Sequence, residues 1–176
     1  MKCRLSAVLI AALCLLSACA GKPEICTPEP GASTPPADLP TAPPELTVTV
    51  GEENCTALRG GWSWTYDLGN GTYSGAIADS SHPLALQQMD PRPPMDADVT
   101  QAVLSFGLAP DLVTVRCWPG SVWEEEDPPS EEAQAEDGVL TLRPGVWLYE
   151  VRAEWDHAPE YWGDASYSFL ADYTPT

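Results

Sequence analysis

Few residues in this chain of 176 offer catalytic chemistry. Histidine is the most frequent general base in enzymes, and the chain has two, His82 and His157. The string DSSH at 79–82 contains the residue types of a hydrolytic triad, but such triads are assembled from distant elements, and neighbours on one loop rarely point at each other. No nucleophile elbow, phosphate-binding glycine loop or dinucleotide fingerprint is present. The sequence therefore predicts a protein that is not an enzyme and has no cofactor.

Two stretches contain oxygen ligands of the kind that calcium prefers. Residues 124–137 hold eight carboxylates, but without the alternate-residue ligand pattern and the sharp glycine turn of a calcium loop. We therefore expect a solvated acidic loop at 124–138. Residues 67–72, DLGNGT, are better explained as a hairpin turn, because Gly and Asn adopt positive φ at low cost. The sequence predicts no metal site.

Tryptophan provides the best indication of a binding surface. The aromatic residues of 62–66 alternate along one expected strand and are interpreted as core. Trp118, Trp123 and Trp162 lie at strand ends or in loops, and Trp118 is out of phase with the apolar residues of 113–117. Exposed rings of this kind stack on sugars or grip apolar side chains. These three are the candidate ligand-binding residues, and the alternative that they fill the core stays open.

The overall charge limits the classes of partner. Against 8 Lys and Arg stand 26 Asp and Glu, a net charge of −18. Phosphate backbones and anionic lipid surfaces both bind proteins through basic side chains. We therefore expect no nucleic-acid partner and no electrostatic docking on a membrane. The hydrophobic content of 44% is too high for a wholly disordered chain.

The N-terminus has the pattern of an export signal. Lys2 and Arg4 precede an apolar run at 5–16 that is too short to cross a bilayer, and the run ends in Leu-Ser-Ala-Cys at 16–19. This string resembles the lipobox of bacterial lipoproteins, in which the cysteine receives a diacylglycerol and becomes the new N-terminus. The resemblance implies a signal peptide at 1–18, acylation of Cys19 and an extracytoplasmic protein anchored to the cell membrane. The alternative is an ordinary secretory signal.

Three cysteines remain after that processing. They are Cys26, Cys55 and Cys117. A bridge between Cys55 and Cys117 would close a loop of about 60 residues and stabilise the fold by roughly 4 kcal/mol. The alternative is that Cys117 is a small buried apolar residue. Both interpretations stay open.

The chain after Cys19 divides into two parts of different composition. Residues 19–45 are rich in proline and poor in large aliphatic side chains, which predicts a disordered, extended linker. From residue 46 to 176 the apolar residues alternate in short runs, at 46–50, 62–66, 73–78, 102–106, 113–117, 139–142, 147–155 and 166–173. A helical turn fits 84–89. Seven or eight short strands predict one antiparallel β-sandwich.

The terminal strands contain a more specific pattern. Residues 144–153, PGVWLYEVRA, resemble the tyrosine corner of immunoglobulin-like and fibronectin-like domains. The resemblance implies that Tyr149 bonds back to the preceding corner. Val151 stands where an antibody domain has its second core cysteine, so the antibody-type disulfide is excluded.

A further resemblance concerns the domain from residue 46 onward. The strings ALRGGWSWTY, DSSHPL, PDLVTVRCW and YEVRAEW are similar to a domain in lipoproteins of Gram-positive anaerobes. The domain also resembles the extracytoplasmic tails of metallopeptidase antirepressors of the β-lactam-sensor type. No His-Glu-x-x-His string is present, so the peptidase activity is not implied.

These observations predict a lipid-anchored, non-catalytic binding or sensing module at the cell envelope, with an immunoglobulin-like sandwich. Its expected partners are the bilayer, through the acyl anchor, and a cell-wall glycan or an envelope protein. One alternative is a structural or adhesive spacer. Another is a hydrolase of envelope polymer, with a cleft around Asp79, His82 and Asp90. The strand pattern does not indicate an oligomeric state.

Overall fold

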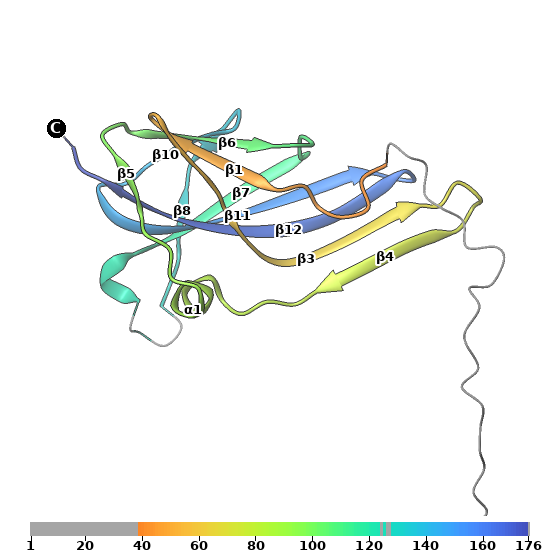
Figure 1. The fold of residues 1–176 in the computed structure, drawn as a ribbon, viewed down its shortest axis with the longest axis horizontal. Helices are drawn as coiled ribbons and strands as arrows, with labels where there is room; N and C mark the ends of the chain where they lie inside the picture. Colours follow the sequence, from red (N-terminus) through yellow and green to blue (C-terminus); the bar gives the residue numbers. More distant parts are fainter. Residues whose placement is uncertain (1–38, 124, 126–127, 176) are drawn as a thin grey trace, which may run out of the picture. The chain divides into compact units, whose positions relative to one another are not determined.

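The computed structural model describes residues 39–123, 125 and 128–175. The expected signal peptide at 1–18, the acylation site Cys19, Cys26 and most of the expected linker lie outside the described residues. Within them, the chain forms two packed sheets, as the strand pattern predicts. Figure 1 shows β1, β6 and β10 in one layer and β3, β4, β11 and β12 in the other.

The smaller sheet has five strands in the order β2-β1-β6-β10-β9, and every neighbouring pair is antiparallel. Its strands are β1 (Leu46–Val50), β2 (Glu53–Thr56), β6 (Gln101–Phe106), β9 (Ala135–Glu136) and β10 (Val139–Thr141). Because apolar residues alternate along β1 and β6, one face of this sheet is buried and the other faces water.

The larger sheet has the order β4-β3-β12-β11-β7-β8, and a short strand, β5, runs parallel beside the end of β12. Its strands are β3 (Leu58–Asp67), β4 (Tyr73–Ala78), β5 (Met95–Ala97), β7 (Leu112–Pro119), β8 (Glu131–Ala133), β11 (Gly145–His157) and β12 (Tyr161–Tyr173). The pairing of β11 with β12 continues over the full length of both strands. This long hairpin is therefore the centre of the sheet.

The strand order is that of an immunoglobulin-like domain with one insertion. β1, β6, β10 and β9 occupy the positions of strands A, B, E and D, and β7, β11 and β12 those of C, F and G. Between the A and B positions the chain inserts β2, the β3–β4 hairpin, the helix α1 (Pro83–Met89) and β5. The hairpin pairs through β3 with the outer edge of β12. The insertion thereby widens the larger sheet by two strands.

The core lies between the inner faces of the two sheets. It contains Trp64, Trp155 and Tyr161, with ring centroids 5.4 and 5.6 Å from Trp64. Aromatic rings bury more apolar area per side chain than aliphatic residues do, so they fill a sandwich with few isoleucines and phenylalanines. The assignment of the aromatic residues of 62–66 to the core holds for Trp64, which is 1% exposed.

The expected tyrosine corner is present. The hydroxyl of Tyr149 accepts a hydrogen bond from the backbone N–H of Arg143 at 2.8 Å. Tyr149 is fully buried, and burial raises the pKa of its hydroxyl to about 12. The bond ties the start of β11 to the chain that leaves β10.

The last residues of the predicted linker lie against the sandwich. Residues 39–45, which we call the strap, accept three hydrogen bonds through proline carbonyls. Trp64 Nε1 donates to the Pro40 carbonyl at 2.8 Å, Arg59 Nη1 to Pro43 at 3.0 Å, and the Tyr167 hydroxyl to Pro44 at 2.5 Å. The ordered domain therefore begins before residue 46, because carbonyls flanked by proline rings can accept hydrogen bonds from the sheet without forming a strand.

Four short strands lie outside the sequence prediction, namely β2, β5, β8 and β9. β8 and β9 fall within residues 124–138, where the sequence predicts a solvated acidic loop. The carboxylates of these strands are exposed as expected, but 131–133 and 135–136 are strands and not loop. The cause is a long-range contact. β8 pairs with β7, and Arg143 donates to the Glu132 carbonyl at 2.7 Å and forms an ion pair with Glu131.

Candidate functional site

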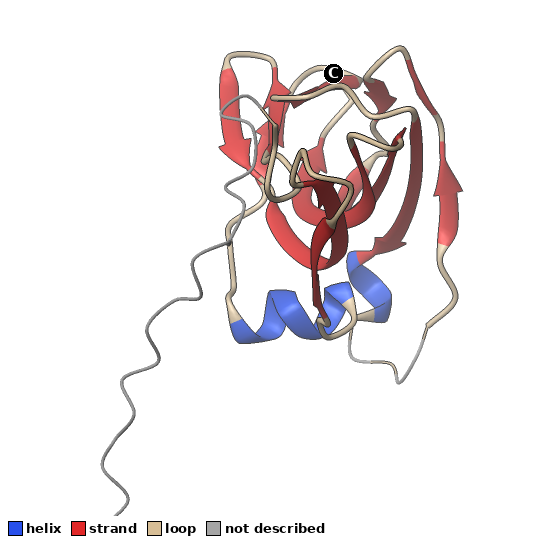
Figure 2. Ribbon diagram, turned by 90° about the vertical axis from the view of Figure 1, so that its right-hand side faces the viewer, coloured by secondary structure: helices blue, strands red, loops and turns tan. Residues whose placement is uncertain are grey.

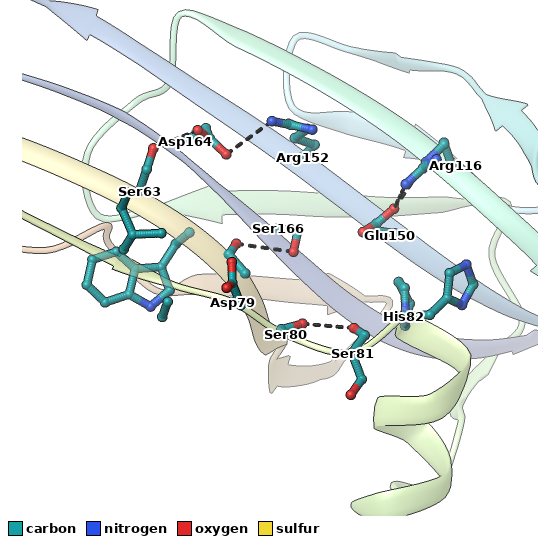
Figure 3. Close-up of a pocket in the computed structure, with 15 residues that line it drawn as sticks. Ser63, Asp79, Ser80, Ser81, His82, Arg116, Glu150, Arg152, Asp164 and Ser166 are labelled. Atoms are coloured by element: carbon teal, nitrogen blue, oxygen red, sulfur yellow. Dashed lines mark hydrogen bonds and ion pairs between the residues drawn. The ribbon is translucent and has the colours of Figure 1, made fainter.

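A groove of about 430 Å³ lies on the outer face of the larger sheet, where the inserted hairpin meets strands β7, β11 and β12. Polar side chains from five segments line it (Figure 3). They are Ser63, Asp79, Ser80, Ser81, His82, Arg116, Glu150, Arg152, Asp164 and Ser166. Outward-facing residues alternate with core residues along these strands, so the groove floor and the core are opposite faces of one sheet.

Asp164 is the centre of one half of the groove. Its Oδ2 accepts a hydrogen bond from the Ser63 hydroxyl at 2.7 Å, and its Oδ1 lies 3.2 Å from Arg152 Nη2. Asp164 is paired with Ser63 in the sheet register, so the β3–β12 pairing itself brings the two together. The Arg152 side chain remains 58% exposed. The pair therefore presents N–H donors and carboxylate oxygens side by side.

The other half of the groove contains a second ion pair. Arg116 donates from Nε and Nη2 to one oxygen of Glu150, at 3.1 and 2.5 Å. The two residues are direct cross-strand partners on β7 and β11. Glu150 is only 8% exposed, and a buried carboxylate is costly unless it is paired and hydrogen-bonded. The Arg116 side chain is 55% exposed. Its guanidinium therefore covers the Glu150 carboxylate, and its remaining N–H groups are accessible from the groove.

A β-bulge places Ser166 between the ion pairs of the two halves of the groove. The register of β12 against β3 shifts between Ala165 and Tyr167, and Ser166 occupies the irregular position. Its hydroxyl donates to the Gly61 carbonyl at 3.3 Å. A Cβ on Gly60 would lie 2.5 Å from the Ser166 hydroxyl oxygen, so a larger residue there would require the Ser166 side chain to move. Two glycines in a strand interior are the sequence signal for this close approach.

The end of the groove at α1 is closed by a second, smaller apolar cluster. It consists of Leu84 on α1 and of Trp118, Leu148 and Leu170 on the outer face of the sheet. Figure 2 shows α1 and the short helix η1 (Gly120–Val122) together at this end of the strands. The outer face of the sheet is thus apolar and covered at one end, and polar and open beside it.

Trp118 lies in this cluster, so the expectation that its ring is exposed for a ligand is wrong and the alternative that it fills a core holds. It does face away from Val115 and Cys117, as its phase predicts, but it is 1% exposed. Its Nε1 donates to the Pro128 carbonyl at 3.1 Å, and the His82 ring packs edge-on against it at 5.0 Å. The periodicity gave the correct side of the sheet. It did not reveal that α1 covers that side.

The other two candidate tryptophans differ in their surroundings. Trp123 is partly buried against the cluster under α1, and its buried Nε1 has no hydrogen-bond partner among the described residues. Trp162 is partly buried on the outer face of β12, two positions from Asp164. It packs edge-on against Tyr73 of β4, with ring centroids 5.2 Å apart, and Tyr73 is 51% exposed. Of the three, Trp162 is on the same face of β12 as Asp164, beside the groove but not among the residues that line it.

The two histidines have structural contacts. His82 precedes α1, and its Nδ1 accepts a long hydrogen bond, 3.3 Å, from the backbone N–H of Leu84. Asp79 and His82 both line the groove, whereas Asp90 ends α1 and pairs with Arg92. The three residues suggested for a hydrolase are therefore not brought to one place. His157 lies 3.4 Å from Asp111 and packs on Tyr161.

The described cysteines are both free thiols, so the bridge between Cys55 and Cys117 that the sequence left open is not formed. Cys117 is fully buried, and its Sγ lies 3.6 Å from the Glu131 carbonyl. Cys55 Sγ lies 3.3 Å from Met95 Sδ. Burial raises the pKa of both thiols.

The turn at 67–72 has the expected hairpin geometry. Asp67 Oδ1 accepts from the Gly69 N–H at 2.8 Å, Asn70 Oδ1 accepts from the Thr72 N–H at 3.0 Å, and Gly69 and Gly71 have positive φ. Among the described residues, His, Cys, Asp and Glu side chains form no group of three that could hold a metal. No helix in the described part of the chain has both the length and the apolar character that a membrane crossing needs.

The comparisons with protein-family models, curated proteins and solved structures gave no match for this chain.

Proposed function

We propose that this chain is a bacterial lipoprotein anchored through an acylated Cys19, and that its sandwich is a non-catalytic binding or sensing module at the cell envelope. The observation that carries the proposal is the open polar groove on the outer face of the larger sheet. The resemblance to antirepressor tails supports a sensory module separated from its membrane machinery.

The groove supports binding because its polar groups are held in place without a ligand. Asp164 is fixed by Ser63 and Arg152, and Glu150 by Arg116. Side chains that are already ordered lose little conformational freedom when a ligand binds. A spacer that only decorates the envelope has no need of such a surface. A hydrolase needs a base free to take a proton, and the Nδ1 of His82 already accepts from the start of α1.

The anchor is tested by metabolic labelling with a radioactive fatty acid. We expect the parent protein to carry the label and to sediment with membranes. The Cys19→Ser variant should be unlabelled and should be released in soluble form, because it lacks the proposed acyl attachment. Label retained by Cys19→Ser would refute acylation at this residue.

The groove is tested with the Cys19→Ser chain, so that the acyl group cannot cause sedimentation. Isolated envelopes are mixed with this protein, and the bound fraction is measured after centrifugation. Arg152→Ala and Asp164→Ala should each reduce the bound fraction severalfold. Thr114→Ala is the matched control, because Thr114 is the cross-strand neighbour of Arg152 but does not line the groove. Equal binding by all variants would overturn the assignment of the groove.

A further inference from the structure

We propose that the groove binds an uncharged glycan chain, with Trp162 and Tyr73 as the stacking surface and the Arg152–Asp164 pair as the polar contact. This inference rests on the proposed function and names the ligand class of the same site. Three features of the groove lead to it: its charge balance, its arrangement of donors and acceptors, and the position of the aromatic pair beside it.

The charge balance disfavours anionic ligands. Two arginines, Arg116 and Arg152, face three carboxylates, Glu150, Asp164 and Asp79, and each arginine is already paired with a carboxylate. An anionic polymer would have to displace these carboxylates and approach a chain with a net charge of −18. Within the described residues, no His, Cys, Asp and Glu side chains gather as a metal-ion site would require. A neutral ligand, unlike an anionic one, meets no electrostatic penalty here.

The donors and acceptors match hydroxyl groups. Arg152 and Asp164 form an ion pair with side chains 58% and 35% exposed, so N–H groups and carboxylate oxygens face the groove next to each other. A hydroxyl group both donates and accepts, so two neighbouring hydroxyls of a sugar can bond to the guanidinium and to the carboxylate together. The Ser63 hydroxyl, bonded to the same Asp164, adds a third polar group of fixed orientation.

The aromatic pair Trp162 and Tyr73 lies beside this polar contact, next to the residues that line the groove. Trp162 and Asp164 are two positions apart on one face of β12, which separates their Cα atoms by roughly 7 Å. Tyr73 supports the Trp162 ring edge-on and is itself half-exposed. Ile77, which is 79% exposed on β4, is the cross-strand partner of Ser63. The C–H face of a sugar ring can stack on such an apolar surface while its hydroxyls reach Asp164 and Arg152.

The groove has a direction, which Figure 3 shows. Ser63 and Asp164 lie at one side of the view, and Arg116, Glu150 and His82 at the other, where α1 begins. The cluster beneath α1 closes that end. A glycan therefore enters from the β3–β4 hairpin, stacks on Trp162 and runs toward Arg116.

The test uses the whole Cys19→Ser chain and calorimetric titration with defined oligosaccharides. Chitotetraose, cellotetraose and maltotetraose are the neutral probes, and tetragalacturonate is the anionic probe. We expect saturable binding of at least one neutral probe and none of tetragalacturonate. Trp162→Ala and Arg152→Ala should each weaken that binding fivefold or more.

Two control variants make the result specific. Trp147 is also partly buried in the larger sheet, but it lies against Pro144 and outside the groove, so Trp147→Ala should leave glycan affinity unchanged. Thr114→Ala is the corresponding control for Arg152→Ala, and it should also leave glycan affinity unchanged. Arg152 forms an exposed ion pair, so its removal should cost little stability, and thermal melts of every variant separate lost binding from lost folding.

The outcomes distinguish this inference from the proposed function. If no neutral probe binds while envelope binding still depends on Arg152, the ligand class is wrong and the binding function stands. If tetragalacturonate binds in the groove, the charge argument is refuted. If the envelope assay also shows no dependence on Arg152 or Asp164, both proposals fail.

Discussion

The tyrosine corner allows a sharp quantitative prediction through Tyr149→Phe. The change removes one oxygen from a fully buried side chain and leaves the backbone N–H of Arg143 without its acceptor. An unsatisfied buried donor costs about 1–3 kcal/mol, and for a domain of this size about 2 kcal/mol corresponds to a fall in the unfolding midpoint of roughly 7 °C. We expect that fall at pH 8.

The difference between the parent and Tyr149→Phe should become smaller in alkali. The pKa of the Tyr149 hydroxyl is about 12 in the folded protein, against 10.0 for an unperturbed tyrosine. As the pH rises from 10 toward 12, the unfolded chain releases this proton and the folded protein keeps it, so the parent loses stability. At pH 11 this loss is on the order of 1 kcal/mol for the one group, and the variant is spared it. Tyr167, whose pKa is also raised to about 12, contributes equally to both proteins.

The assay is urea unfolding of the parent and the variant at pH 8 and pH 11, followed by circular dichroism. Tyr73→Phe is the control, because the ring is 51% exposed and its substitution should change the midpoint little at either pH. A cost below 1 kcal/mol at pH 8 would refute the structural role of the corner. A gap that stays constant or widens at pH 11 would refute the burial argument for the pKa.

Three further predictions concern packing and thiols. Trp118→Ala should destabilise the domain by about 3–5 kcal/mol in urea unfolding, because it empties the cluster beneath α1, and a cost under 1 kcal/mol would restore Trp118 as a surface residue. Gly163→Ala should lower the midpoint and weaken envelope binding together, because its Cβ would lie 2.2 Å from the Ser63 carbonyl oxygen; unchanged melts would disprove the close strand approach. With a thiol reagent, Cys55 should react slowly in the folded protein and Cys117 only on unfolding, so prompt modification of Cys117 would contradict its burial.

Local sequence patterns predict the strands and the tyrosine corner, because both kinds of structure depend on residues that are close together in the sequence. The alternation at 46–50 and the hairpin turn before 73–78 predicted the observed bounds of β1 and β4, and the expected helical turn lies within α1. The Tyr149–Arg143 bond spans six positions, so the partner of Tyr149 directly precedes the motif at 144–153. The sandwich class follows from the number and spacing of the strands.

The groove depends on contacts between distant residues, and no local pattern contains them. Ser63 and Asp164 are 101 positions apart and meet because β3 pairs with β12. Alternation places Glu150 and Arg152 on the outer face, but their partners on β7 and β12 follow from the sheet register. The glycines at 60 and 61 were the one local signal of this site, since they allow the Ser166 bulge to approach β3.

The strap has a mechanical consequence for a tethered protein. A pull applied at Leu39 acts first on the carbonyls of Pro40, Pro43 and Pro44, whose hydrogen-bond donors belong to β3 and β12. β1, the next element along the chain, is held on both sides by β2 and β6 and resists in shear. A pull on the strap therefore reaches the two strands that carry Ser63 and Asp164 before the sandwich yields. In the anchored binding protein that we propose, force on the anchor would act on the same pair of strands that forms the groove.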